Sequence, residues 1–328
     1  MPSIDMHNHI IPADVVSFLE REGQSYSARI VEREGRRFVE IQESALRPLS
    51  EKMVNPEARI RDMDADSLDM QAISCSPPLM FPEVNGELGL ALSQCYNDAI
   101  ASIASSDRFV GMGMVPIQDA KASISELERL VKLGFRSVQI PTNVGSRTLD
   151  EPEFEEFWSA AEALDLLVYL HPFEAARSGG LNKYGLGGIV GNLYDTGLAA
   201  TLLIFGGVLE RHPKLSVVLS HGGGTLPSLI GRMDMGYKSF PGAGDSIPRP
   251  PSTYFNQLYF DTITFNPNML RYLIDTYGSD RVVLGSDYPM AMAQPATDVR
   301  NLGLDARTEQ AVLGDNAFRL LGHSAKAV

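Results

Sequence analysis

Short apolar runs rich in β-branched residues recur along the chain, and stretches with helical spacing separate them. Eight such runs occupy residues 3–7, 70–75, 109–115, 136–141, 166–171, 215–221, 257–262 and 281–287. In the stretches between them, such as 87–105 and 153–165, apolar residues recur at spacings of three and four, which is typical of amphipathic helices. A strand followed by a helix, repeated eight times, predicts a parallel (β/α)8 barrel, the TIM barrel. A length of 328 residues suits such a barrel, so we expect one domain over residues 1–328.

One segment departs from this alternation. Residues 13–60 are too long for a simple first connection, and apolar and polar residues alternate there on both sides of an EGRR turn. This pattern predicts a small β-hairpin over residues 24–44, inserted after the first strand and helix and covering the barrel mouth. The Pro/Gly-rich residues 240–252 predict a loop before the seventh strand.

Several residues with metal-binding or acid–base chemistry follow the predicted strands. Active sites of (β/α)8 barrels lie at the C-terminal ends of the strands, so such residues converge on one mouth. The candidates are His7, His9, His171, His221 and Asp287. A single strand-end histidine is more often a satisfied polar residue than a ligand, but five such residues at one level predict a metal site. The spacing of His7 and His9 places both side chains on one face of an extended strand.

Imidazole and carboxylate ligands favour one divalent ion, most often zinc, with manganese or iron also compatible. The fourth predicted strand is followed by no lysine that could be carbamylated to bridge two metals, so we expect a mononuclear site. Three protein ligands with an open position are the usual arrangement for catalysis.

The net charge of −13 argues against a nucleic-acid or anionic-membrane partner and favours a small-molecule substrate. We find no apolar run of about 18 residues, so no membrane span is expected. No charged leader precedes the first strand, and Cys75 and Cys95 suit reduced thiols. Together these features predict a cytoplasmic protein.

Other residues allow two interpretations. Arg59 and Arg61 lie among aspartates on a predicted helix, and we expect a solvated, salt-bridged face there rather than a ligand contact. Asp261 ends the seventh strand, where it either orients a ligand or is an ordinary strand-end aspartate. Apolar residues after the second and eighth strands either line a pocket or pack loops; they are Met80, Phe81, Met290 and Met292.

A set of motifs runs in order through nearly the whole chain: NPEARIRDMD, RFVGMGMVPIQ, FRSVQIPT, LHPF, FGGVLERHPKLSVV, SHGGGTLPSLIGRMDMGY and DRVVLGSDYP. This set resembles the amidohydrolase superfamily (amidohydrolase-2 branch), and within it the 2-amino-3-carboxymuconate-6-semialdehyde decarboxylases. The resemblance implies that the metal ligands are His7, His9, His171 and Asp287. It implies that His221 is the acid–base residue beside the metal. It also implies a homodimer in which Arg232 of one subunit holds a carboxylate in the other subunit's site.

The sequence departs from these decarboxylases at two places. Where they carry a substrate-binding arginine before the PE-x-RI motif, alignment by eye gives Ser50, with Arg47 or Lys52 as possible replacements. Phe173 stands where they carry tryptophan beside the substrate. The exact substrate is therefore expected to differ.

Two reactions suit these residues. The resemblance favours non-oxidative decarboxylation of an unsaturated or aromatic carboxylic acid, with His221, or Asp287 loosening from the metal, supplying the proton. The alternative is metal-dependent hydrolysis of a lactone or amide. A hydratase, and a metal-binding barrel without turnover, are smaller alternatives.

Overall fold

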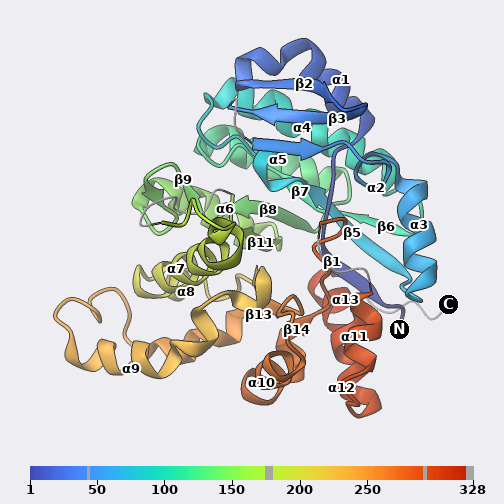
Figure 1. Cartoon of the computed structure of the whole chain (residues 1–328). Coiled ribbons are helices and arrows are strands. Elements are labelled where there is room, and N and C mark those ends of the chain that lie inside the picture. Colours follow the sequence, from blue (N-terminus) through green and yellow to red (C-terminus); the bar gives the residue numbers. More distant parts are fainter. Residues whose placement is uncertain (43–44, 174–179, 291–293, 323–328) are drawn as a thin grey trace.

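The computed structural model describes residues 1–42, 45–173, 180–290 and 294–322, and within them the chain forms a closed parallel barrel (Figure 1). Its strands, in barrel order, are β1 (Ile4–Ile10), β5 (Met70–Cys75), β6 (Phe109–Gly111) continued by β7 (Gly113–Met114), β8 (Ser137–Pro141), β11 (Leu167–His171), β12 (Val217–Leu219), β13 (Leu258–Asp261) and β14 (Val282–Val283). Met6 N donates to Leu284 O at 2.8 Å, and Asn8 bridges to Tyr288, so β14 returns to β1. The predicted TIM barrel is thereby confirmed.

Helices surround the strands. They are α1 (Ala13–Glu22), α2 (Glu51–Val54), α3 (Pro56–Ala65), α4 (Gly86–Ile103), α5 (Ala120–Lys132), α6 (Glu155–Ala163), α7 (Asn192–Phe205), α8 (Val208–Arg211), α9 (Ile230–Ser239), α10 (Pro267–Tyr277), α11 (Pro295–Arg300), α12 (Ala306–Gln310) and α13 (Asn316–Leu320). Several begin at an N-cap side chain: Asn85 accepts from Leu88 N at 3.0 Å, and Asp119 accepts from Ala122 N at 2.9 Å.

A β-bulge in β1 determines which of its side chains face the barrel interior. Asp5 lies opposite Gln71 and Asn8 opposite Ile73, so β1 has one residue more than β5 over this interval. Because side chains alternate along a strand, this extra residue places Met6, His7 and His9 on the same inner face. Met6 belongs to the apolar cluster inside the barrel, whereas Asn8 points outward to Arg59.

Between α1 and α2 the chain forms a small antiparallel sheet, with β2 (Ala28–Arg33), β3 (Arg36–Ile41) and β4 (Ala45–Pro48) in that order. Glu34 and Gly35 make the first turn with φ of 52° and 71°. The sheet has one strand more than the hairpin predicted over 24–44. Figure 1 shows the sheet beside α1 and α4, at one end of the molecule. A second short antiparallel pair joins β9 (Asn143–Val144) to β10 (Arg147–Thr148).

One helical stretch of the described residues, Gly187–Phe205, is long and apolar enough to cross a membrane by length and composition, although the sequence predicted no such stretch. It comprises a π-helical turn, Gly187–Gly191, and α7. Buried members such as Leu203 and Ile204 pack in the hydrophobic core, and core helices of globular proteins pass the same test.

Candidate metal centre

Three histidines and one aspartate meet at the C-terminal end of the barrel. Ligand atoms of His7, His9, His171 and Asp287 all lie within 4.8 Å of one another. The Nε2 atoms of the three histidines are buried and have no hydrogen-bond partner in the structure. Buried polar atoms are rarely left unpaired, so three such nitrogens around one point indicate a binding site for another group. A cation satisfies all three at once.

The other ring nitrogen of each histidine is engaged. His9 Nδ1 lies 3.0 Å from Cys75 O, and His171 Nδ1 lies 2.7 Å from Pro172 O. His7 Nδ1 lies 2.6 Å from Asp261 Oδ2. Carbonyl and carboxylate oxygens accept, so each Nδ1 carries the proton and each Nε2 keeps its lone pair. This is the tautomer that a metal ligand requires.

Asp287 faces the histidines from the segment after β14. Its Oδ1 lies 3.3 Å from His9 Nε2 and 3.6 Å from His7 Nε2. Burial alone raises the pKa of Asp287, but the close imidazoles of His9 and His7 bring the pKa down to about 2. Asp287 has φ +55°, in the left-handed region, and its N–H donates to His7 O at 2.7 Å. The two strand ends that carry candidate ligands are therefore joined through the backbone.

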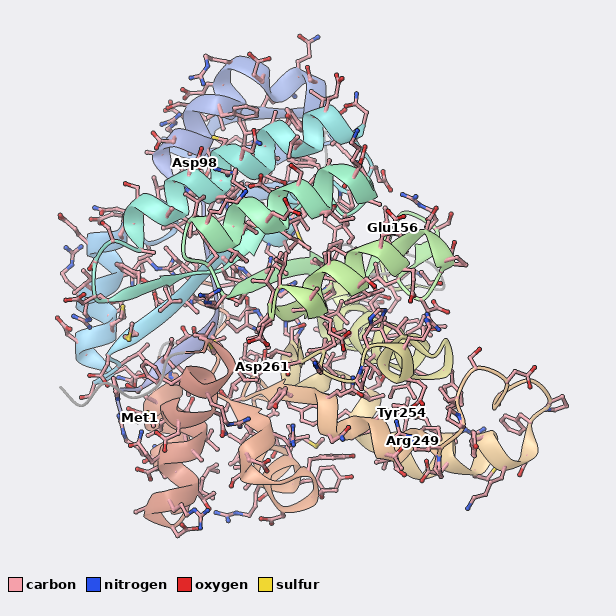
Figure 2. The ribbon with its side chains drawn as sticks, turned by 180° about the vertical axis from the view of Figure 1, so that it is seen from behind. Met1, Asp98, Glu156, Arg249, Tyr254 and Asp261 are labelled. Atoms are coloured by element: carbon pink, nitrogen blue, oxygen red, sulfur yellow. The ribbon has the colours of Figure 1, made fainter. Side chains whose placement is uncertain are left out.

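Asp261, at the end of β13, supports the cluster from behind and lies at the centre of the molecule (Figure 2). Its Oδ2 receives hydrogen bonds from His7 Nδ1, from Tyr169 OH at 2.8 Å and from His221 N at 3.0 Å. Its Oδ1 accepts a hydrogen bond from Gly222 N at 2.7 Å. Burial raises the pKa of Asp261, but the hydrogen bond with His7 outweighs this effect and lowers it. Of the two interpretations of Asp261, the structure supports the orienting role.

We expect Asp261→Asn to weaken metal binding. The amide cannot accept hydrogen bonds on both of its atoms, so the bond that fixes the tautomer of His7 is lost. Changes to such supporting residues typically cost about 10–100-fold in metal affinity. Competition against a chromophoric chelator measures the dissociation constant, with exposed Asp275→Asn on α10 as the control. Equal affinity of Asp261→Asn and wild type would remove the role assigned to Asp261.

His221 follows β12 beside the cluster. Its ring centroid lies 5.2 Å from that of His7 and 5.1 Å from that of His171. Burial lowers the pKa of His221 to about 4, so the ring is neutral at pH 7. The glycines 222–224 that follow all have positive φ, and a Cβ at Gly223 would lie 2.5 Å from the Phe260 ring. The triple glycine therefore forms a tight passage beneath the site.

A cavity of about 590 Å³ opens onto these residues. Its lining includes His9, Arg47, Ser76, Pro77, Pro78, His171, Pro172, Phe173, Asn182, Asn192, His221, Asp287 and Met290. The structure thus places Phe173 and Met290 beside the cluster, whereas Met80 and Phe81 are buried in the core and Met292 lies outside the described residues.

The basic residues that were expected to hold a substrate carboxylate do not all lie at the cavity. Arg47 of β4 lines the cavity, although Ser50 was aligned with the missing arginine. Ser50 does not line it, and Lys52 pairs with Asp62 at 2.5 Å. Arg232 is exposed on α9 and lies apart from this cavity of its own chain.

The interpretation of Arg59 as part of a solvated face is wrong. Its side chain is fully buried beneath β1 and donates to His9 O at 2.6 Å. A signal was present in the sequence, because Arg59 and Met63 are four residues apart and share the buried face of α3. Arg61 is exposed as expected and pairs with Glu51 at 3.2 Å.

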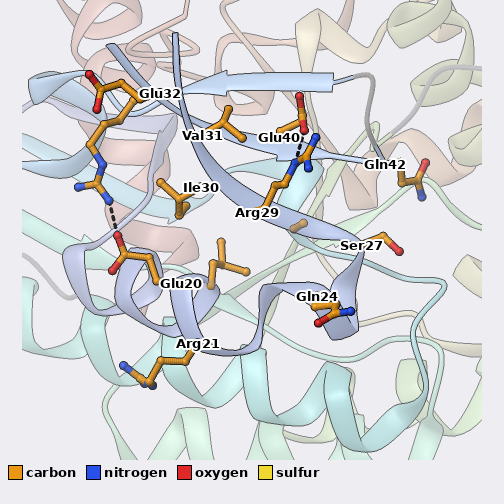
Figure 3. A pocket seen from close by; sticks show the side chains of 13 residues that line it. Glu20, Arg21, Gln24, Ser27, Arg29, Ile30, Val31, Glu32, Glu40 and Gln42 are labelled. Atoms are coloured by element: carbon orange, nitrogen blue, oxygen red, sulfur yellow. Dashed lines mark hydrogen bonds and ion pairs between the residues drawn. The ribbon is translucent and has the colours of Figure 1, made fainter. Parts of the chain in front are cut away.

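A second hollow, of about 1120 Å³, lies between α1 and β2 (Figure 3). Its lining includes Glu20, Arg29 and Glu40, and Arg29 pairs with Glu40 at 2.5 Å. None of the four candidate ligands lines it, so this hollow is separate from the candidate metal centre at the barrel mouth.

A parallel (β/α)8 barrel with a histidine–aspartate cluster at the C-terminal ends of its strands defines the class of metal-dependent barrel enzymes. Residues 4–323 match the amidohydrolase family, and the chain belongs to that family. It is 31% identical to 2-amino-3-carboxymuconate-6-semialdehyde decarboxylase of Dictyostelium discoideum, over 97% of this chain and 91% of that protein.

Two solved structures share the fold. The structure of 5-carboxyvanillate decarboxylase from Sphingomonas paucimobilis has a TM-score of 0.86 and 24% identity, and covers 98% of this chain and 99% of its own. The structure of dihydroxybenzoic acid decarboxylase from Polaromonas sp. JS666, with bound manganese and an inhibitor, has a TM-score of 0.82 and 23% identity. That match covers 99% of this chain and 98% of the other.

Proposed function

We propose that this protein is a metal-dependent, non-oxidative decarboxylase of an unsaturated or aromatic carboxylic acid. The observation that carries the proposal is the group of three unpartnered Nε2 atoms beside Asp287, next to a cavity of about 590 Å³ that His9, His171 and Asp287 line. The 31% identity with a decarboxylase over nearly the whole chain supports the reaction type.

The residues fit one divalent cation held by His7, His9, His171 and Asp287. Zinc is the ion we propose, because imidazole and carboxylate are its usual catalytic ligands. Manganese suits the same donors and is bound in the Polaromonas relative. Metal analysis of the purified protein distinguishes the two.

A cation held there would supply electrostatic stabilisation to the negative charge that develops as a carboxylate leaves. The residues of the chain do the remaining work. Arg47, on the cavity wall, binds an anionic oxygen of the substrate. Phe173 and Pro77 offer apolar surface to an unsaturated ring or chain.

His221 provides the proton. A proton is delivered to the carbon that bears the carboxylate, the bond between that carbon and the carboxylate breaks, and its electron pair remains on the substrate as carbon dioxide departs. His221 lines the cavity and passes the proton to this carbon after taking it up from solvent or substrate. Asp287 lines the same cavity and is the second candidate donor.

We expect Arg47→Gln to raise KM about tenfold to a hundredfold with a smaller change in kcat, because a charge-assisted hydrogen bond is worth roughly 1.5–3 kcal/mol. Steady-state kinetics measures both constants, with a substrate identified by the carbon dioxide assay described in the next paragraph. Lys52→Gln is the control, since Lys52 pairs with Asp62 and does not line the cavity. Unchanged KM in Arg47→Gln would exclude Arg47 from substrate binding.

Release of carbon dioxide from a panel of ortho-hydroxy and ortho-amino aryl carboxylates and muconate-type acids tests the reaction. Metal-stripped protein is the control. Metal-dependent release from one member supports the proposal and identifies the substrate class. If no member of the panel releases carbon dioxide and the protein turns over a lactone or amide, the protein is a hydrolase and the decarboxylase proposal is wrong.

We further propose a homodimer in which Arg232 serves the partner's site. Arg232 lies on α9, which projects from the body of the molecule (Figure 1). Exposed apolar side chains gather on the π-helical turn, α7 and α9; they are Ile189, Val190, Tyr194, Leu198 and Met235. Sedimentation equilibrium measures the oligomeric state.

The two free cysteines, Cys75 and Cys95, support a proposed cytoplasmic location.

A further inference from the structure

A buried arginine lies directly behind the candidate metal centre. Arg59 is 0% exposed, and it is the one arginine or lysine among the buried residues that the structure describes. Burying a guanidinium is costly unless its donors are satisfied. A cation kept in this position therefore needs a physical reason.

Its hydrogen bonds converge on the strand that carries His7 and His9. Arg59 Nη1 donates to His9 O at 2.6 Å, and Arg59 Nη2 donates to Asn8 Oδ1 at 2.6 Å. Arg59 Nε donates to Gln71 Oε1 on β5 at 2.9 Å. The planar fork thus fixes the backbone of one candidate ligand and the register of β1 against β5.

The face of the same guanidinium contacts the segment that carries Asp287. Arg59 Cζ lies 4.6 Å from the centroid of the Tyr288 ring. Tyr288 O accepts from His9 N at 2.8 Å, and Tyr288 OH donates to Asp62 on α3 at 2.7 Å. Arg59 and Tyr288 therefore join α3, β1 and the residue next to Asp287 in one network.

Arg59 is also linked by hydrogen bonds to one of the carboxylates that surround the histidines. Three carboxylates surround the histidines: Asp5 and Asp261 are fully buried, and Asp287 is largely buried. Gln71 links Arg59 to Asp5, since its Nε2 donates to Asp5 Oδ2 at 3.2 Å.

We propose that Arg59 is a positioning residue that sets the distance between His9 and Asp287 and so determines metal affinity. This inference rests on the proposed metal centre and extends it to a residue outside the ligand set. Arg59 touches no ligand side chain; it acts through the His9 carbonyl and the Tyr288 ring. Supporting residues of this kind typically contribute about 10–100-fold to metal affinity or activity.

The test compares Arg59→Lys and Arg59→Gln with Arg61→Gln, the exposed arginine one half-turn away on α3. Zinc and manganese dissociation constants are measured by competition against a chromophoric chelator, and melting temperatures are recorded with and without metal. We expect metal affinity to fall about tenfold or more in Arg59→Gln, less in Arg59→Lys, which keeps the charge but loses the fork, and not at all in Arg61→Gln.

A purely structural role predicts a different result. The melting temperatures of metal-free and metal-loaded protein would then fall together, and the dissociation constant would match that of wild type. That outcome overturns the inference while leaving the metal centre intact. A wild-type protein that binds no metal would instead overturn the proposed function.

Tyr288→Leu keeps the test decisive if both Arg59 variants fail to fold. This change removes the ring that lies against the guanidinium but leaves the arginine and its hydrogen bonds. Weaker metal binding in Tyr288→Leu than in Tyr288→Phe supports the coupling between the two strand ends. Equal binding in both variants overturns it.

Discussion

Replacing His9 by alanine is expected to remove bound metal and turnover together. His9 Nε2 is one of three unpartnered nitrogens at the centre of the cluster, and it lies 3.3 Å from Asp287 Oδ1. Its loss leaves two imidazoles and one carboxylate, with an empty space where the ring was. We expect the metal dissociation constant to rise by more than the roughly 10–100-fold that changes to supporting residues produce.

Metal content after dialysis, measured by mass spectrometry, checks this expectation, and near-ultraviolet circular dichroism checks the fold. His212→Gln is a matched control, because His212 is also buried but pairs with Glu155 at 3.0 Å, outside the cluster. His212→Gln should keep one equivalent of metal. A His9→Ala protein that also kept one equivalent would show that the ligand set is misassigned.

The five candidate residues were predictable because one rule links sequence to space in this fold, whereas the choice of four ligands among them came from the family resemblance. Strand ends of a parallel barrel meet at a single mouth, so residues as far apart in sequence as His9 and Asp287 were expected together. The eight strands were recognisable because each is a buried run of apolar, often β-branched residues. The roles of these residues as metal ligands stay predictions that metal analysis will decide.

Supporting residues were harder to predict, because their partners depend on three-dimensional packing. Asp261 joins His7, Tyr169 and His221, and no spacing in the sequence links these four positions. Arg47 reaches the cavity only because β4 pairs with β3, where Arg47 lies opposite Val39. The sequence pattern predicted a two-stranded hairpin and missed the third strand, although it named Arg47 as a replacement for the missing arginine.

Burial of a charged residue was the other source of error. Arg59 lies among acidic neighbours on a short helix, and charged helical residues are most often exposed. Its burial is possible because Asn8, Gln71 and the His9 carbonyl accept hydrogen bonds from its donors and the Tyr288 ring covers its face. Sites that break local rules in this way are often functional, which is the reason to test Arg59 by metal affinity.

The second large effect is expected at His221, where the metal should remain but turnover should fall. His221 lies beside the four candidate ligands but outside their group, and its backbone N–H is held by Asp261 at 3.0 Å. Because burial lowers its pKa to about 4, the ring is neutral at pH 7 and can accept and return a proton. Loss of a positioned acid–base group typically costs about 10²–10⁴-fold in rate.

The choice of substitution matters, because His221 has φ +55°. Alanine is strained in this region, whereas asparagine tolerates it, so His221→Asn separates lost chemistry from backbone strain better than His221→Ala. We expect both variants to bind one equivalent of metal and to lose kcat by about 10²–10⁴-fold, with little change in KM. Single-turnover measurements of carbon dioxide release, with metal content determined on the same samples, check this. If His221→Asn kept full activity, the acid–base role assigned to His221 would be wrong, and Asp287, which lines the same cavity, would be the next donor to test.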